Sequence, residues 1–117
     1  MEEMQAAGLA KSIGVSNFSA QHLKAVLTTA KVVPAVNQVE FHAYLQHASL
    51  LELHKKHGIA TEAYGPLSAV TKASPGPVDD YVAGLAKKYA VSPAEIALRW
   101  CIDQDIIPIT TSAKEQR

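Results

Sequence analysis

Short apolar runs of the kind found in β-strands alternate along this chain with segments whose apolar residues recur at helical spacing. The strand-like runs are 12–18, 34–41, 59–64 and 106–111. No Asn-Gly or Asp-Gly pair, the usual signal of a tight hairpin, separates any two of them. Parallel strands need a crossover connection, which is usually a helix, so this order predicts parallel βα units. The expected fold class is therefore α/β, with right-handed connections.

The helical segments carry signals for their ends. Ser19 is expected to cap the helix that follows the first strand-like run. Ser92 and Glu95 match a capping box, and Pro93 stands at the first helical position, where its missing N–H costs nothing. Gly58 follows a helical segment with a basic last turn and is an expected helix terminator.

The histidines and the cysteine give no indication of a metal site. His54 and His57 lie three residues apart in a basic stretch, which is typical of a solvated last helical turn. No His or Cys spacing matches a zinc motif. Cys101 lies on an apolar helical segment, so we predict a core residue and not a nucleophile.

Charge and composition limit the choice of partner and compartment. Eleven basic residues balance eleven acidic ones, which disfavours nucleic acid or an acidic membrane surface as the main partner. The apolar runs are too short for a membrane-spanning helix, and the first residues do not resemble a signal peptide. A single cysteine suits a reducing compartment. We therefore expect a single cytoplasmic domain over residues 1–117.

Polar and aromatic residues gather at the ends of the predicted strands, where parallel βα folds place their functional groups. Amides, hydroxyls and a phenol of this kind suit a ligand with an amide-bearing ring better than they suit a metal. The residues at the four strand ends are Ser16 and Asn17; Gln38, Glu40 and His42; Tyr64; and Thr110, Thr111 and Ser112.

Each of these positions also has a structural explanation. Ser16 and Asn17 could simply begin the following helix. Gln38 and Glu40 could belong to a structural hydrogen-bond network, because buried polar groups need partners. Tyr64 could be a packed aromatic residue with a tethered hydroxyl.

Several motifs together resemble the aldo-keto reductase family, in the family's order and over essentially the whole chain. The "YGPL" and "ITTSAKEQR" segments are most similar to the fungal branch that reduces ketones and keto amides or esters. The other segments that carry the resemblance are "GLAKSIGVSNF", "AVNQVEFHAYLQ", "KKHGIATEAYGPL" and "PAEIALRW".

The resemblance implies a partial TIM (β/α)₈ barrel of about four parallel βα units, similar to barrel strands five to eight. It also implies NADPH as cofactor and a small carbonyl compound as substrate. Ser16, Asn17 and Gln38 would then bind the nicotinamide carboxamide, and Tyr64 would stack on the nicotinamide ring. The backbone around Leu67 would line the pyrophosphate.

The resemblance places the 2′-phosphate of the cofactor's adenosine at the last residues, with Ser112 and Arg117 as its contacts. Thr111 stands where many members have Lys, which removes one charge from this site. Ala43 and Gly65 replace a usual Pro and a common Ser.

The family's catalytic Asp, Tyr, Lys and His would come from the first half of the barrel, so we expect no catalytic residue in this chain. Tyr64 is not the family's proton donor, and His42 is not its catalytic His. A whole barrel needs roughly 250 residues. Met1 falls within a segment similar to the end of the fourth barrel helix, which favours an internal methionine.

The expected function is the cofactor-binding half of an NADPH-dependent reductase that converts a ketone or aldehyde to an alcohol. The isolated chain is expected to be inactive. One alternative is a non-enzymatic half-barrel that binds nucleotide or assembles with other chains, for example through open sheet edges. The other is a truncated gene product without function.

Overall fold

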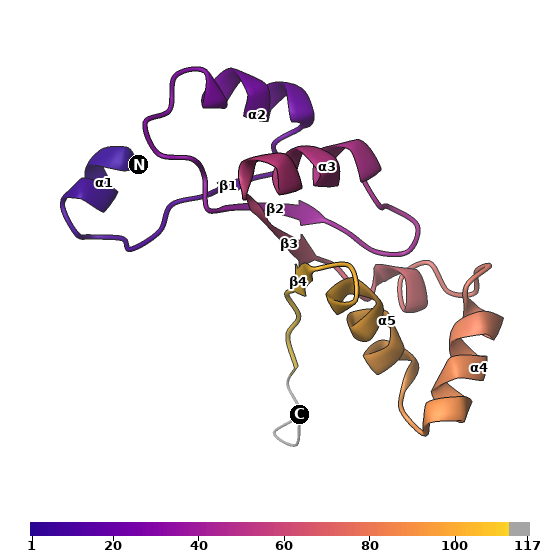
Figure 1. Ribbon diagram of the computed structural model, residues 1–117. Helices are drawn as coiled ribbons and strands as arrows, with labels where there is room; N and C mark the ends of the chain where they lie inside the picture. The colour runs from indigo at the N-terminus through magenta and orange to yellow at the C-terminus, as the bar shows by residue number, and fades with distance from the viewer. Residues whose placement is uncertain (113–117) are drawn as a thin grey trace. The chain divides into compact units, whose positions relative to one another are not determined.

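The computed structural model describes residues 1–112 (Figure 1). Strands and helices alternate as the sequence predicts. The strands are β1 (Val15–Ser16), β2 (Val36–Glu40), β3 (Ala60–Tyr64) and β4 (Ile106–Pro108). The helices are α1 (Glu2–Ala6), α2 (Ala20–Leu27), α3 (Ala48–His57), α4 (Asp79–Tyr89) and α5 (Pro93–Ile102), with a 3₁₀ helix, η1 (Ser68–Val70).

Within these residues the strands form a four-stranded parallel sheet in the order β1-β2-β3-β4. Val15 pairs with Asn37 and Ser16 with Gln38 in the β1–β2 ladder. Each strand lies beside its successor in the chain, and the intervening segment contains at least one helix. The predicted α/β class with parallel strands is therefore confirmed.

The first and last predicted strands are shorter than expected. The backbone at Asn17 turns to a left-handed φ of 57°, which ends β1. Gly14 precedes β1 at a close approach, because a β-carbon there would collide with the Val36 side chain and lie 2.8 Å from its carbonyl oxygen. β4 ends at Pro108, and the Ile109 N–H beyond it still donates to the Ala63 carbonyl oxygen of β3 at 2.8 Å.

The chain divides into two compact units. Unit 1 comprises Met1–Val39 and His47–Glu62, and unit 2 comprises Glu40–Gln46 and the chain from Ala63 onward. In unit 1, α2, β2 and α3 contribute to one apolar core. Its buried members are Leu23, Val39, Leu50 and Ile59.

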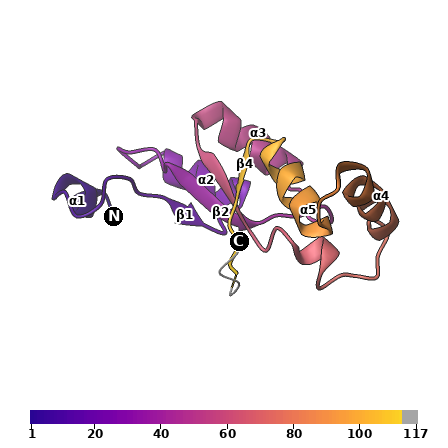
Figure 2. The same cartoon turned by 90° about the horizontal axis from the view of Figure 1, so that it is seen from below.

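In unit 2, α4 and α5 pack against each other and lie side by side in both views (Figure 1; Figure 2). Trp100 of α5 stacks on the buried Phe41 ring, with the ring centroids 5.4 Å apart and the planes at 19°. Cys101 is fully buried, and burial raises the pKa of its thiol. The predicted core role of Cys101 is confirmed.

The predicted helix ends are also confirmed. The Ser19 side chain accepts a hydrogen bond from the His22 backbone N–H at the start of α2. Ser92 and Glu95 form the complete capping box of α5. Gly58 ends α3 in a left-handed conformation with φ 67°.

The expectation of a solvated last turn of α3 holds for His57, which is exposed, and is wrong for His54. The His54 side chain is 1% exposed and forms hydrogen bonds on both ring nitrogens. His54 lies four residues after the buried Leu50, so both fall on the inward face of α3.

Among the residues that the structure describes, no helix combines the length and apolar character needed to cross a bilayer.

Candidate functional site

In unit 1 the end of β1 and the middle of β2 share one hydrogen-bond acceptor. The carbonyl oxygen of Gln38 accepts the Ser16 hydroxyl at 3.0 Å and the Asn17 backbone N–H at 2.8 Å. Ser16 and Asn17 are exposed, and Gln38 is half-buried. The structure therefore brings these three predicted site residues together at one strand end.

The Gln38 side chain has a protein partner. Its Nε2 donates to Glu62 Oε2 of β3 at 2.8 Å. The structural network considered from the sequence thus exists. A side-chain amide offers two N–H donors and an oxygen with two lone pairs, so this bond uses one of four positions.

In unit 2 the residues that follow β3 and β4 meet the first turns of α5 at a cleft of ≈ 670 Å³. The cleft brings together Leu67, Thr111 and Ser112, which the sequence predicts as site residues. The remaining lining residues are Ser92, Ala94, Glu95, Leu98 and Thr110. Arg117, the other predicted phosphate contact, lies outside the described residues.

The cleft is lined by hydroxyl and apolar groups. Thr110, Thr111 and Ser112 are exposed. Glu95 contributes the one carboxylate among the described lining residues. Its Oε2 accepts hydrogen bonds from the backbone N–H of Ser92 at 2.8 Å and from the Ser92 hydroxyl at 2.7 Å. The sequence indicated Ser92 and Glu95 only as a helix cap and missed that this cap faces a cleft.

Tyr64 ends β3, and its side chain is 37% exposed. Its carbonyl oxygen accepts the Phe41 backbone N–H at 3.2 Å. The chain then turns at Gly65, whose φ of 61° favours glycine. This conformation accounts for glycine at a position where the resemblance implies a common Ser.

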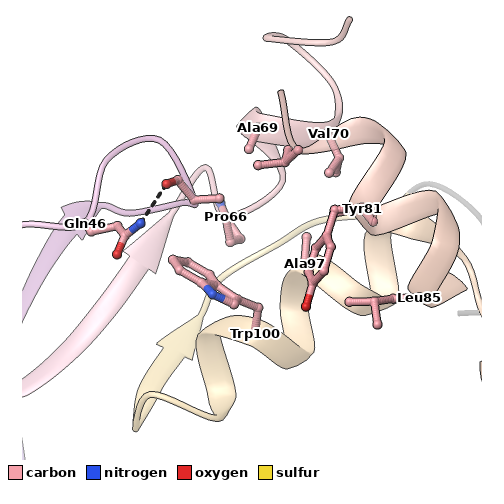
Figure 3. Close-up of a pocket in the computed structure, with 11 residues that line it drawn as sticks. Gln46, Pro66, Ala69, Val70, Tyr81, Leu85, Ala97 and Trp100 are labelled. Atoms are coloured by element: carbon pink, nitrogen blue, oxygen red, sulfur yellow. Dashed lines mark hydrogen bonds between the residues drawn. The ribbon is translucent and has the colours of Figure 1, made fainter. Parts of the chain in front are cut away.

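A second hollow in unit 2, a cavity of ≈ 270 Å³, was not predicted from the sequence. Its lining comes from the segments after β2 and β3 and from α4 and α5 (Figure 3). Trp100, Tyr81 and Leu85 supply apolar surface, and Gln46 donates from Nε2 to the Ala43 carbonyl oxygen at 2.9 Å. The cavity contains none of the predicted site residues.

Titratable groups near β2 do not form a metal site. The described residues hold no group of three or more His, Cys, Asp or Glu side chains that could bind a metal ion. His42 Nε2 lies 3.5 Å from Glu40 Oε1. Burial, and secondarily the charge of His47, lowers the pKa of His54, which favours the neutral imidazole.

The sequence profile of the Aldo/keto reductase family matches residues 1–117. The chain belongs to the aldo/keto reductase family. Among similar family members, the NAD/NADP-dependent indole-3-acetaldehyde reductase of Schizosaccharomyces pombe is 41% identical over 100% of this chain and 42% of its own length. The NADPH-dependent alpha-keto amide reductase of Saccharomyces cerevisiae is also 41% identical, over 100% of this chain and 39% of its own length.

Solved aldo-keto reductase structures superpose closely on this chain. The Bombyx mori aldo-keto reductase in complex with NADP has a TM-score of 0.92 and 35% identity, over 100% of this chain and 40% of that chain. The chain thus spans about two fifths of the length of the curated relatives it matches. Its fold is the matching part of an aldo-keto reductase TIM barrel, as the sequence predicted.

Proposed function

We propose that this chain supplies the cofactor-binding, C-terminal half of an NADPH-dependent aldo-keto reductase that reduces a small ketone or aldehyde. In this proposal residues 1–117 are one partial domain, its strands correspond to barrel strands five to eight, and the protein belongs to the fungal branch. The observation that carries the proposal is the whole-chain family match, together with the meeting of Leu67, Thr111 and Ser112 at one cleft.

The groups at the end of β1 fit a neutral carboxamide. The Ser16 hydroxyl hydrogen is engaged with the Gln38 carbonyl, so toward a ligand its oxygen would act as an acceptor. The Asn17 and Gln38 amides can both donate and accept. We assign the nicotinamide carboxamide to Ser16, Asn17 and Gln38 and the nicotinamide ring to stacking on Tyr64.

The unit 2 cleft fits phosphate groups. Hydroxyls of Thr111 and Ser112 can donate to phosphate oxygens, and backbone near Leu67 can approach the pyrophosphate. Arg117 would add a guanidinium. Because Thr111 replaces a common Lys, we expect a smaller preference for NADPH over NADH than a lysine would give.

When bound, the cofactor supplies the hydride that reduces a carbonyl carbon. The residues of this chain hold and orient it, and the family's proton-transfer residues are proposed to lie in the first half of the barrel. The isolated chain should therefore bind cofactor without turning over substrate. A cytoplasmic setting is part of this proposal, since a single buried cysteine suits a reducing compartment.

The test is calorimetric titration of the purified chain with NADPH and with NADH. Thr111→Lys should tighten NADPH binding by at least about tenfold, because a charge-assisted hydrogen bond is worth roughly 1.5–3 kcal/mol. It should leave NADH binding nearly unchanged. Thr28→Lys, which adds the same charge at an exposed position after α2, is the matched control and should change neither affinity.

Three results would contradict the proposal. A chain that is folded by circular dichroism yet binds neither nucleotide cannot be a cofactor-binding half. Equal gains in NADPH affinity from both lysine variants would mean that the phosphate does not lie at Thr111. Loss of NADPH absorbance with a ketone substrate, free of contaminating activity, would contradict the predicted inactivity.

Assembly through a sheet edge is the second candidate. β4 is an edge strand within the described sheet, and Ile107 and Ile109 at this edge are 51% and 39% exposed. Exposed apolar edges favour pairing with another chain. Light scattering should then show a dimer or larger species for this chain; a monomer at high concentration would exclude this candidate.

A further inference from the structure

A buried polar network in unit 1 lies directly behind the proposed carboxamide site. It joins Asn37 of β2, His54 of α3 and Thr61 of β3, with exposures of 0%, 1% and 6%. Buried polar groups are costly unless they are paired, and these side chains pair with one another. None of them is among the residues that the proposed function assigns to cofactor.

One end of the network holds the backbone of Phe18. The Phe18 N–H donates to Asn37 Oδ1 at 3.3 Å, and Asn37 Nδ2 donates to the Phe18 carbonyl oxygen at 2.8 Å. Since only the oxygen can accept the Phe18 N–H, the orientation of the Asn37 amide is fixed. The amide thus pairs with Phe18 on both its donor and its acceptor.

The other end of the network fixes the histidine tautomer. The second hydrogen on Asn37 Nδ2 points to His54 Nε2 at 3.0 Å, so Nε2 must be an acceptor. The imidazole proton then lies on Nδ1, which donates to Thr61 Oγ1 at 2.8 Å. Hydrogen bonds are therefore donated in one direction along the network, from Asn37 to His54 and from His54 to Thr61.

The segment Ser16–Phe18 is consequently held from two adjacent positions of β2. The Gln38 carbonyl holds Ser16 and Asn17, and the Asn37 amide holds Phe18. Asn17 lies between these anchors with a left-handed φ of 57°, a conformation that few side chains adopt without support. Loosening Asn37 would release the residue that carries the carboxamide-binding side chain.

We infer that His54 and Thr61 are positioning residues, which hold the Asn37 amide so that Ser16 and Asn17 meet the nicotinamide carboxamide. The inference rests on the proposed function. A positioning role differs from a purely structural role in one measurable respect. Disturbing the network should weaken the binding of the nicotinamide end of the cofactor and no other part of it.

The test compares two ligands of the purified chain, NADPH and adenosine 2′,5′-bisphosphate, which lacks the nicotinamide. His54→Leu should weaken NADPH binding about tenfold, equivalent to roughly 1.4 kcal/mol, and leave the bisphosphate affinity within about twofold. His54→Gln keeps an amide that can accept from Asn37, so it should restore part of the loss. Thr61→Val, close in shape to threonine, gives a second variant should His54→Leu fail to fold.

The possible outcomes separate the two proposals. If the unaltered chain binds neither ligand, the proposed function fails and the inference fails with it. If it binds both and the folded variants weaken neither, the inference alone is wrong. Equal weakening of both ligands would mean that the network serves stability only and would also overturn the inference.

Discussion

Acidification should destabilise this chain through His54. The side chain is 1% exposed, and burial together with the His47 charge lowers its pKa below the ordinary value of 6.5. Its Nε2 accepts from Asn37, and a proton there would place two donors face to face. The folded state therefore binds this proton more weakly than the unfolded state does.

The sign of the effect follows from this difference. The stability that neutral His54 contributes is fully present at pH values above the pKa of this histidine in the unfolded chain. It is lost as the pH falls towards the lower pKa that His54 has in the folded chain. If His54 stays neutral in the folded state, RT ln(1 + 10) gives a loss of about 1.4 kcal/mol at one pH unit below 6.5. Glu2, whose pKa is lowered by the Val32 and Lys31 backbone N–H groups, loses its contribution only below about 4.5.

Urea unfolding followed by circular dichroism, at pH values from about 7.5 to 5.5, measures this loss. His54→Gln, which has no titrating ring, should flatten the dependence by up to about 1.4 kcal/mol. His57→Gln removes an exposed imidazole from the same helix and should leave the effect of His54 in place. If His54→Gln retains the full loss, or if His57→Gln abolishes it, the argument from burial is wrong.

Two further predictions concern the cores. Leu23→Ala should destabilise the chain by about 3 kcal/mol, because Leu23 is fully buried. The control Leu9→Ala, at a residue 75% exposed, should cost less than about 0.5 kcal/mol. Equal urea midpoints for the two variants would contradict this prediction. Cys101 should react with a thiol reagent only after unfolding, since burial raises the pKa of its thiol. A native-state rate that matches the rate in urea would refute that expectation.

Local signals in the sequence were sufficient for the helix ends. Ser19, Gly58 and the Ser92–Glu95 pair each act within one turn of their own helix. Such contacts depend on residues that are neighbours in sequence, so no knowledge of the tertiary fold is needed to predict them.

The environment of His54 depends on tertiary structure and was missed. The basic residues around it indicated solvent, but the decisive partners are Asn37 and Thr61, which lie 17 and 7 residues away. The four-residue spacing from Leu50 was the available signal, and it was outweighed by local charge. The strand ends show the same limit, since β1 stops where Asn17 adopts a left-handed backbone that composition does not reveal.

The candidate site was predictable in part. Alternating strands and helices predict that strand ends, including Thr111 and Ser112, share one edge, and the family resemblance adds Leu67. The unit 2 cleft gathers all three residues. The sequence did not predict that the N-terminal turn of α5 would line the same cleft. Capping depends on contacts within the turn, whereas lining depends on which distant segments pack beside it.

The left-handed backbone of Asn17 restricts the choice of amino acid at this position from two directions. The backbone conformation favours Gly, Asn and Asp, because other side chains meet steric resistance there. The proposed contact with a neutral carboxamide requires a side chain that both donates and accepts, which removes Gly and an ionised Asp. Asparagine meets both demands with a short side chain, so Asn17 should tolerate substitution poorly.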